Sequence, residues 1–507
     1  MKLILTLLLL IPSLSWGLTF KDGKQVEENS KTLVENQNNN SLQKDKIVKK
    51  AFDISLKLDV AVNEVYFNNL GDLNNDNVED FLVSFMINPS VYGAAFYKID
   101  AKTANELPLT PIYLFYSNEN GYEYSVLPQE VWSKRMWAAK SFNFNGKNFI
   151  LLGRNGEVGM PEQNPGEKVS VLEVNFSNNE PIYSKIYKEK NNSVTAWVDT
   201  FVHNNEFYLL ISNYNNIKKY GTGVYDSSIF KFDEKVELTK ADMEPSTKSR
   251  NAHNTMIIKD IDGDNKLDFM AAMEIWKTHD KDALFKTTNP GSYIIFDWLS
   301  EEPLINKTRI LLDPLFNLDH AGFAINSLKI DNKQFFIEIS GRFMGHSSNQ
   351  LYKESNISFY NFTDIENLNK DYLKNKFRDS LKNSKLKDRF DLLNENYFLE
   401  NKIIKIIKSF DLKLNEGPQQ SKIFFYDIDK DKNEDVIVSI YQNKKMYFSL
   451  QNNEWVEKKL PFSLINNSGK RVKSELLFNK KGDCALLVSA PAYLETKNIR
   501  LHFSECL

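Results

Sequence analysis

One acidic pattern occurs three times in the chain and constrains the fold more than any other feature. Each copy is a nine-residue segment with Asp or Asn at its first, third, fifth and ninth positions. The copies are the first, second and third acidic loops, Asp72–Asp80, Asp260–Asp268 and Asp427–Asp435. Each follows a run of apolar residues and precedes another one. Polar turn residues between two short apolar runs are typical of hairpins, so the pattern predicts three strand–loop–strand units.

Four other segments have the same layout without the acidic residues. Their turns lie at Asn145–Gly146, Asn204–Asn205, Asp331–Asn332 and near Gly482. Asn-Gly and similar pairs favour tight hairpins because the central residues need positive φ angles. The seven turns recur on average about every 68 residues, which is enough for one four-stranded sheet with generous loops. Radial repetition of such sheets predicts an all-β fold, namely a seven-bladed β-propeller.

The two ends of the repeated region carry strand patterns that suit each other. Residues 52–60 alternate apolar and polar side chains, which is the period of a half-buried strand. Ile499, Leu501 and Phe503 alternate in the same way near the other end. We expect the N-terminal strand to complete the last blade beside the C-terminal strands, so that the ring is closed within residues 51–507.

Three segments do not follow the repeat. Residues 1–17 combine a positive start, an apolar core and small residues near the end, which predicts a signal peptide and export to the periplasm or the outside of the cell. Residues 18–50 are polar and Asn-rich, and predict a flexible leader. Within residues 364–396, apolar residues recur at near-helical spacing among charged ones, which predicts a helical insertion. It is either a lid packed on the propeller or a segment that binds a partner.

Charge and hydropathy exclude some classes of protein. The chain has 64 Lys and Arg against 67 Asp and Glu, a formal net charge of −3, which argues against a nucleic-acid partner. After the signal peptide no apolar run is long enough for a transmembrane helix, so none is expected in the mature chain. The only two cysteines, Cys484 and Cys506, could form a disulfide in an oxidising compartment, or could be two unrelated thiols.

The acidic loops suit a hard cation. Several carboxylates within nine residues repel one another, and Ca²⁺ relieves this by taking six to eight oxygen ligands in flexible geometry. Mg²⁺ is less suited because it demands stricter octahedral geometry. An EF-hand would need an acidic residue at position 12, where this chain has Val83, Ala271 and Val438. EF-hands are therefore excluded, and the remaining alternatives are a calcium loop between strands or a solvated acidic turn without metal.

The strand–acidic loop–strand unit resembles the FG-GAP/VCBS repeat of integrin α-subunit propellers and many exported bacterial proteins. The resemblance is close in the three acidic loops and covers the other four units only by layout. It implies about three structural Ca²⁺ ions, with position 7 contributing its backbone carbonyl. The implied ligands are Asp72, Asn74, Asp76, Val78 and Asp80; Asp260, Asp262, Asp264, Lys266 and Asp268; and Asp427, Asp429, Asp431, Asn433 and Asp435.

The loops depart from the family pattern at position 6, which is usually Gly. Gly263 matches, Asn77 is a tolerable substitute because Asn visits the left-handed region, and Lys432 is a poorer one. We therefore rank the second acidic loop first as a metal site.

No catalytic motif stands out in the sequence. The favoured function is accordingly an exported, calcium-stabilised binding or adhesion module that recognises a protein or carbohydrate ligand on a loop face, rather than an enzyme. Two alternatives remain. One is a propeller-fold enzyme acting on extracellular polysaccharide, a lyase or hydrolase, with converging acids at the central channel. The other is a structural subunit of an envelope assembly.

Overall fold

The computed structural model is all-β in the part of the chain that it describes. These residues hold strands and two short 3-10 helices, η1 (Pro89–Tyr92) and η2 (Gln129–Val131), and among them no helix is long and apolar enough to cross a membrane. The predicted signal peptide, leader and helical insertion lie outside the described residues. The described residues are 51–92, 106–118, 121–155, 169–189, 194–203, 205–217, 222–233, 238–240, 251–259, 267–275, 292–299, 305–312, 320–331, 333–342, 355–362, 404–412, 421–440, 444–459, 472–479, 484–491 and 493–504.

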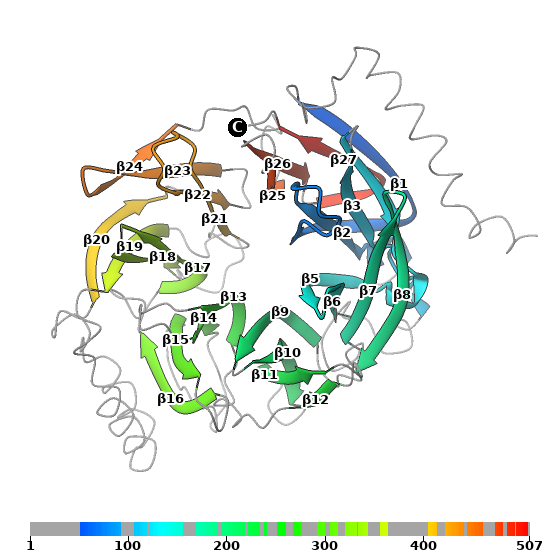
Figure 1. The fold of residues 1–507 in the computed structure, drawn as a ribbon, viewed down its shortest axis with the longest axis horizontal. Coiled ribbons are helices and arrows are strands. Elements are labelled where there is room, and N and C mark those ends of the chain that lie inside the picture. The colour runs from blue at the N-terminus through cyan, green and yellow to red at the C-terminus, as the bar shows by residue number, and fades with distance from the viewer. Residues whose placement is uncertain are drawn as a thin grey trace, which may run out of the picture.

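Five four-stranded antiparallel sheets follow one another along the chain, and each pairs its strands in chain order. Figure 1 shows them standing around a common centre. The prediction of an all-β fold built from radially repeated sheets is thereby confirmed. The strands are β5 (Arg135–Phe144), β6 (Lys147–Asn155), β7 (Val169–Ser177) and β8 (Glu180–Glu189); β9 (Val194–His203), β10 (Glu206–Ile217), β11 (Thr222–Phe232) and β12 (Leu238–Lys240); β13 (Asn251–Lys259), β14 (Asp268–Ile275), β15 (Ser292–Leu299) and β16 (Ile305–Leu312); β17 (His320–Ile330), β18 (Lys333–Arg342), β19 (Ser355–Phe362) and β20 (Ile404–Asp411); β21 (Lys422–Tyr426), β22 (Asp435–Ile440), β23 (Lys444–Gln451) and β24 (Glu454–Lys458).

The sixth sheet joins the two ends of the described chain. Its seven strands run in the order β25-β26-β27-β1-β2-β3-β4. The long strand β1 pairs with β27 through its first part, where Leu56 lies opposite Ile499, and with β2 through its last part, where Phe67 lies opposite Val83. The expected pairing of the terminal strands is therefore confirmed. The strands are β1 (Phe52–Gly71), β2 (Asp80–Ile87), β3 (Tyr113–Asn118), β4 (Gly121–Val126), β25 (Val472–Asn479), β26 (Cys484–Pro491) and β27 (Tyr493–Phe503).

The hairpins predicted without acidic residues are present. Asn145 and Gly146 have φ angles of 51° and 76° between β5 and β6, as a tight turn with two left-handed residues requires. Asn205 and Asp331 have φ angles of 61° and 47° before β10 and β18. The turn near Gly482 lies outside the described residues, but β25 and β26 on either side of it pair as expected.

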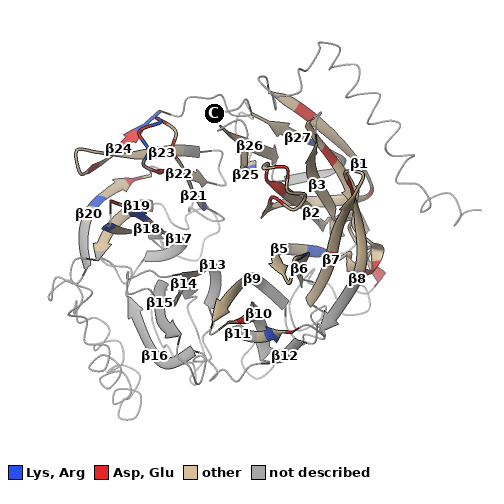
Figure 2. Ribbon diagram, viewed as in Figure 1, with Lys and Arg blue, Asp and Glu red and all other residues tan. Residues whose placement is uncertain are grey.

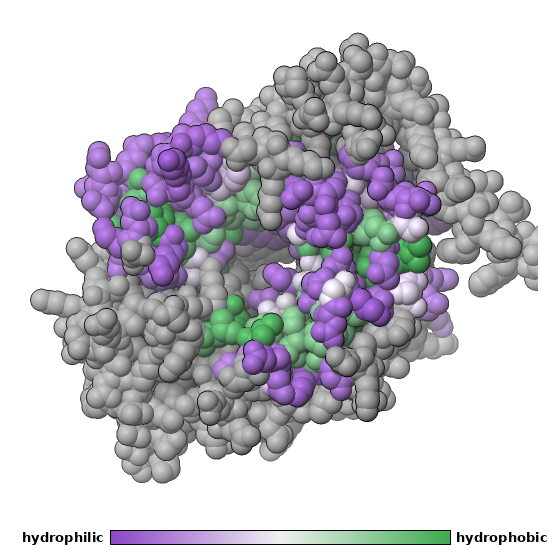
Figure 3. Space-filling view, in the orientation of Figure 1, coloured by the Kyte–Doolittle hydropathy of each residue, from purple (hydrophilic) through white to green (hydrophobic). Residues whose placement is uncertain are grey.

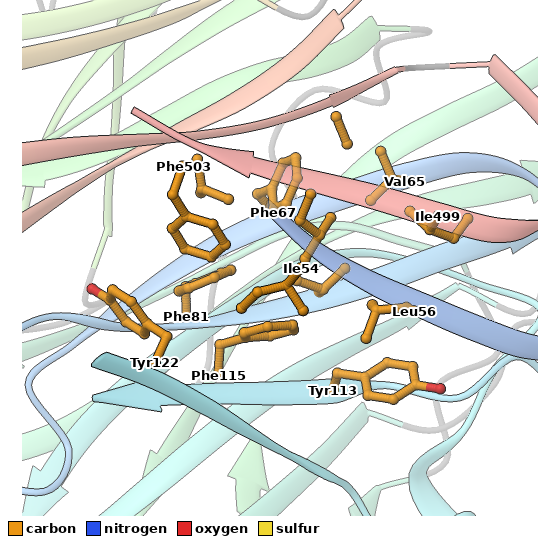
Figure 4. Close-up of a cluster of buried hydrophobic side chains, with 14 of the residues drawn as sticks. Ile54, Leu56, Val65, Phe67, Phe81, Tyr113, Phe115, Tyr122, Ile499 and Phe503 are labelled. Atoms are coloured by element: carbon orange, nitrogen blue, oxygen red, sulfur yellow. The ribbon is translucent and has the colours of Figure 1, made fainter. Parts of the chain in front are cut away.

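The core lies between neighbouring sheets. Every residue of β2 is buried, because alternate side chains pack against opposite neighbours. Phe81 faces the C-terminal strands, where Phe503 lies 6.0 Å away between ring centroids, while Leu82 faces the cluster that includes Ile150 of β6. Figure 4 shows the cluster around Phe81, in which the aromatic rings of Phe115 and Tyr122 meet beneath β27. Burial on both faces explains why β2 is apolar from Phe81 to Ile87 except at Ser84.

The predicted disulfide between Cys484 and Cys506 falls outside the described side chains. Cys484 begins β26, but its side chain and the whole of Cys506 lie outside the described residues. The disulfide stays a prediction.

Candidate metal centres

The first acidic loop connects β1 to β2 and is held by its own carboxylates. The two oxygens of Asp72 accept hydrogen bonds from the backbone amides of Asp76 at 3.0 Å and Asn77 at 2.8 Å. Asn75 and Asn77 have φ angles of 60° and 68°, a conformation that Asn tolerates better than most residues. These two reversals wrap the backbone around the carboxylates, so that residues at alternate positions share one loop interior.

Asp80 closes the loop from a wholly buried position. Its side chain accepts hydrogen bonds from the amide of Leu73 at 2.8 Å and from the amide of Ser117, in β3, at 3.0 Å. Burial, and then the charges of Asp76 and Asp72, raise the pKa of Asp80 well above its ordinary value. No described Lys, Arg or His forms an ion pair with these three acids. Buried carboxylates are normally paired with a cation or bind a metal.

The remaining predicted side chains of the first loop turn towards the same strand, β3. Asp76 accepts hydrogen bonds from the amide of Val78 at 2.9 Å and from the hydroxyl of Ser117. Asn74 accepts from the amide of Asp76 at 3.2 Å and donates to the Ser117 carbonyl at 2.7 Å. The structure therefore brings Asn74, Asp76 and Asp80 to Ser117 at the end of β3, while Asp72 binds amides of the loop itself.

The third acidic loop, between β21 and β22, repeats this arrangement. Asp427 accepts from the amides of Asp431 at 3.1 Å and Lys432 at 2.9 Å, which are the same two loop positions. Lys430 and Lys432 have φ angles of 61° and 77°, again at positions 4 and 6. The amide of Asn433 donates to Asp431 at 2.8 Å. Two separate segments with a common spacing thus adopt a common backbone.

The third loop gathers its carboxylates closely. One oxygen each from Asp427, Asp429 and Asp435 lies within 4.8 Å of the others, an arrangement that could hold a metal ion. Carboxylate oxygens are the ligands that a hard cation such as Ca²⁺ prefers, so the donor set fits the metal that the sequence predicts. Burial raises the pKa of Asp435 to about 6, although the amide of Ile428 donates to it at 2.9 Å.

A lysine already approaches the third loop. The Nζ atom of Lys458, in β24, lies 2.6 Å from Asp429 Oδ2, and the Ser449 hydroxyl lies 3.0 Å from the same oxygen. Burial opposes ionisation of Asp429, but these two hydrogen bonds outweigh it and lower the pKa of that carboxyl. A metal ion in this loop would have to share Asp429 with Lys458 or displace it.

The second acidic loop is outside the described residues as far as Lys266. Asp268 begins β14 and pairs with Lys259 at the end of β13, so the strands that flank the loop are antiparallel neighbours as predicted. The predicted ligands Asp260, Asp262, Asp264 and Lys266 stay predictions.

A polar network that joins β1, β25 and β5 was not identified from the sequence. Glu64 of β1 is buried and Lys473 of β25 is mostly buried, with 3.3 Å between Oε1 and Nζ. Tyr66 donates its hydroxyl hydrogen to Glu64 and accepts from Nε of Arg135, in β5, at 3.2 Å. Lys473 also lies over the Tyr66 ring, 3.6 Å from its centroid. The sequence did carry one signal for this network, because Glu64 is a charged residue within the largely apolar second half of β1.

The electrostatics of this network suit a structural role. Burial opposes ionisation of Glu64, yet the positive charges of Lys473 and Arg135 lower its pKa to about 2. Burial lowers the pKa of Lys473 to about 8 despite the attraction of Glu64. The pKa shift of Glu64 favours its charged form, whereas the pKa shift of Lys473, of similar size, opposes its charged form. The ion pair therefore gives little net stability, but removing one partner would leave the other charge uncompensated.

Comparisons with known proteins give a limited result. No family model and no curated protein matches the chain. Among solved structures, a levansucrase variant from Bacillus subtilis is 11% identical over 66% of this chain and 92% of its own, with a TM-score of 0.28. An alpha-L-arabinofuranosidase from Lactobacillus brevis is 9% identical over 61% and 94%, with a TM-score of 0.33. A beta-fructofuranosidase from Bombyx mori is 8% identical over 96% of both chains, with a TM-score of 0.34. These scores are too low for a shared fold or activity to be inferred.

Proposed function

We propose that this protein is an exported, calcium-binding β-propeller of the FG-GAP/VCBS type that works as a binding or adhesion module. The observation that carries the proposal is the repetition of one loop geometry. Asp72 and Asp427 bind the amides at the same two positions of their loops, and each loop ends on a buried carboxylate, Asp80 or Asp435. Solvated turns have no physical need to bury a carboxylate at their last position.

The proposed ring has seven blades. Five are the four-stranded sheets, and the seven-stranded sheet supplies two more that share β1. In this count β25, β26, β27 and the first part of β1 form the last blade, while the last part of β1 with β2, β3 and β4 forms the first. Seven blades also agree with the seven hairpins in the sequence.

The chemistry that calcium would supply is neutralisation of the loop carboxylates. In the first loop Asp72, Asn74, Asp76 and Asp80 would hold the ion, together with the backbone carbonyl of Val78. In the third loop Asp427, Asp429, Asp431, Asp435 and the carbonyl of Asn433 would do so. In both loops the protein's own part is to position these oxygens through backbone amides. The ion would be structural, and it would stabilise the folded chain according to its concentration and affinity.

The partner surface would be a face of the ring. Blades built in one chain order place equivalent turns on one face, where connecting loops carry binding functions. Figure 3 shows hydrophilic side chains over β23 and β24 and over the β1–β2 region, with hydrophobic patches beside them. A mixed surface of this kind suits a protein or carbohydrate ligand.

One observation supports the enzyme alternative, an activity on extracellular polysaccharide. The Glu64–Tyr66–Arg135 group joins β1 to β5, so polar side chains from two neighbouring sheets converge, as they would in a propeller enzyme. A general acid, however, works best with a pKa near the operating pH, and glycoside hydrolysis commonly needs two carboxylates. With its pKa near 2 and its ion pair to Lys473, Glu64 fits the binding-module proposal better.

The proposed function is tested on residues 18–507 by counting bound metal and recording melting curves in excess Ca²⁺, excess Mg²⁺ and EDTA. We expect two to three Ca²⁺ per chain and a higher melting temperature in Ca²⁺ than in either other condition. Absence of both would overturn the calcium assignment. Incubation with panels of polysaccharides then separates the two functions, because retention without product formation indicates a binding module, whereas new reducing ends or unsaturated products indicate the enzyme.

A further inference from the structure

The first acidic loop is hydrogen-bonded to the last strands of the chain. Val78 forms a bridge with Asn479, at the end of β25. The Glu79 amide donates to the Phe478 carbonyl at 2.9 Å, and the Phe478 amide donates back to the Glu79 carboxylate at 2.9 Å. Figure 2 shows the acidic residues of the β1–β2 connection beside β25. The loop between β1 and β2 therefore contacts β25, which lies almost 400 residues later in the chain.

The contact residues alternate with the proposed metal ligands. Glu79 lies between Val78 and Asp80, so its backbone position is set by the same turn that places the ligand oxygens. Its carboxylate also accepts from Nδ2 of Asn69 at 2.6 Å, and its carbonyl accepts from the Tyr122 hydroxyl at 2.7 Å. A change in the ligand positions would move Glu79 relative to β25, because adjacent residues share a nearly rigid peptide plane.

The third acidic loop approaches the same strand end through a different element. The rings of Tyr426 and Phe478 lie 5.4 Å apart, and Ile428 packs with Leu476 and Phe478 in one buried cluster. The end of β25 thus contacts residues of both described acidic loops or their immediate neighbours. The first loop adds main-chain hydrogen bonds, whereas these contacts of the third are apolar.

The ring is closed here without a covalent link in the main chain. The described chain begins in β1 and ends after β27, and these strands are joined by backbone pairing and by the contacts of Asp53 with Arg500 and His502. Without a cation in the first loop, Asp80 would be a wholly buried carboxyl group with no described Lys, Arg or His in an ion pair with it. Opening of the loop would return this carboxyl group to water, which lowers the cost of burying it, and would release Val78 and Glu79 from β25.

We propose that the first acidic loop is a calcium-dependent clasp that holds the C-terminal strands against the N-terminal ones and so controls how often the ring opens at this junction. The inference rests on the proposed function, since it assumes that the loop binds Ca²⁺. It assigns Glu79, which is not among the predicted ligands, as the residue that transmits loop order to β25. Glu434 occupies the same position of the third loop but is exposed, and it provides a matched control.

The test is hydrogen exchange of the Val472–Asn479 segment in excess Ca²⁺ and in EDTA, with bound Ca²⁺ titrated on the same samples. In the wild-type chain we expect Ca²⁺ to slow exchange of this segment at least tenfold. Glu79→Ala should bind the same number of ions with affinities within about threefold, yet lose most of that protection. Glu434→Ala should keep both the ions and the protection.

The outcomes separate the two proposals. A wild-type chain that binds no Ca²⁺ overturns the proposed function, and the clasp with it. A wild-type chain that binds Ca²⁺ but protects only residues 73–80 overturns the clasp alone. Full protection of β25 in Glu79→Ala likewise overturns it, because the hydrogen bonds of Glu79 would then not transmit loop order. Equal loss of protection in Glu434→Ala would also contradict it, since a general weakening would explain both variants.

Discussion

The first and third acidic loops share a backbone but neutralise their charge differently. In the first, Asp80 is wholly buried and no described cationic side chain pairs with the loop acids. In the third, Lys458 approaches Asp429 to 2.6 Å, and Asp429 is more exposed to water. A protein cation and solvent can therefore serve the third loop in the absence of metal. The first loop has no such cation, and its Asp76 is less exposed than the equivalent Asp431 of the third loop, which makes it more dependent on a bound ion.

The surroundings of the two loops explain this difference. Leu73 and Val78 of the first loop are buried, and the loop is hydrogen-bonded to β3 and to β25. In the third loop the residues at the same two positions, Ile428 and Asn433, are only partly buried. Equal sequence patterns thus give equal local conformation, while affinity and the consequences of metal loss depend on what each loop is packed against.

Replacing the first carboxylate of each loop should give the largest effect and tests the comparison directly. Asp72→Ala leaves two amides without their acceptor in a tightly packed loop and removes a proposed ligand. We expect it to lower the free energy of unfolding by about 5 kcal/mol in excess Ca²⁺ and about 3 kcal/mol in EDTA. Asp427→Ala should lower it by only about 2 kcal/mol in Ca²⁺, because water replaces the lost acceptor. Urea unfolding in both conditions measures these values.

Equal losses in the two variants would contradict the comparison. If Asp72→Ala cost the same in Ca²⁺ and in EDTA, the first loop would not gain stability from the ion. Asn75→Ala, at an exposed position of the first loop whose side chain is no predicted ligand, provides a control for changes in loop conformation alone.

Lowering the pH should have the next largest effect on the free energy of unfolding. It also limits the pH range in which the two loops can be compared. The folded pKa of Glu64 is about 2, below its ordinary value of 4.5. Its contribution to stability is therefore present above pH 4.5 and is lost as the pH falls towards 2. The expected loss is about 3 kcal/mol over this window, with or without Ca²⁺. Thermal unfolding of the wild type and Glu64→Gln from pH 6 to pH 2.5 measures it.

Glu64→Gln should be less stable than the wild type near neutral pH, since it leaves Lys473 buried without a carboxylate, and it should show a shallower fall in acid. A variant whose unfolding free energy fell in parallel with that of the wild type would show that other carboxylates carry the acid sensitivity. Comparisons of the two loops above pH 7 lie clear of this window and above the pKa of about 6 of Asp435.

The parts of this architecture that depend on local sequence could be predicted. Alternating acids between two apolar runs give both loops, and Asn145–Gly146 gives a hairpin, because positive φ angles and short-range hydrogen bonds restrict the chain to few conformations. The pairing of residues 52–60 with the C-terminal strand was also predictable, since both segments alternate and the repeat needs a closing partner.

Contacts between distant residues could not be predicted in the same way. Nothing near Asp429 in the sequence indicates Lys458, and nothing near Glu79 indicates Phe478. Both contacts arise from how strands are placed across sheets and between them. The polar network of Glu64, Tyr66, Arg135 and Lys473 has the same origin. Glu64 contacts Lys473, and Tyr66 contacts Arg135, only when strands distant in the sequence lie side by side. A single sequence gives the residue types of a site before it gives their partners.

Removing Lys458, which competes with a metal ion for Asp429, should have a smaller effect and tests the difference between the two loops. In Lys458→Met the carboxylate of Asp429 is no longer held by a cation, and a metal ion need not displace one. We expect the third loop to bind Ca²⁺ about fivefold more tightly, or about 1 kcal/mol, while the first loop is unchanged. Calorimetric titration of the wild type and the variant at low ionic strength measures both sites. Weaker binding in the variant would mean that Lys458 positions Asp429 for the ion.

The smallest expected effect concerns the sixth position of each loop. Lys432 has a φ angle of 77° and Asn77 one of 68°, so both lie in the left-handed region. Glycine adopts this region freely, whereas a long side chain pays a steric cost that Asn partly avoids. Lys432→Gly should therefore raise the free energy of unfolding by about 0.5 to 1 kcal/mol in EDTA, and Asn77→Gly by about 0 to 0.3 kcal/mol. Parallel urea unfolding of the two variants gives the difference, and a larger gain for Asn77→Gly would mean that the side chain, rather than the backbone, limits the first loop.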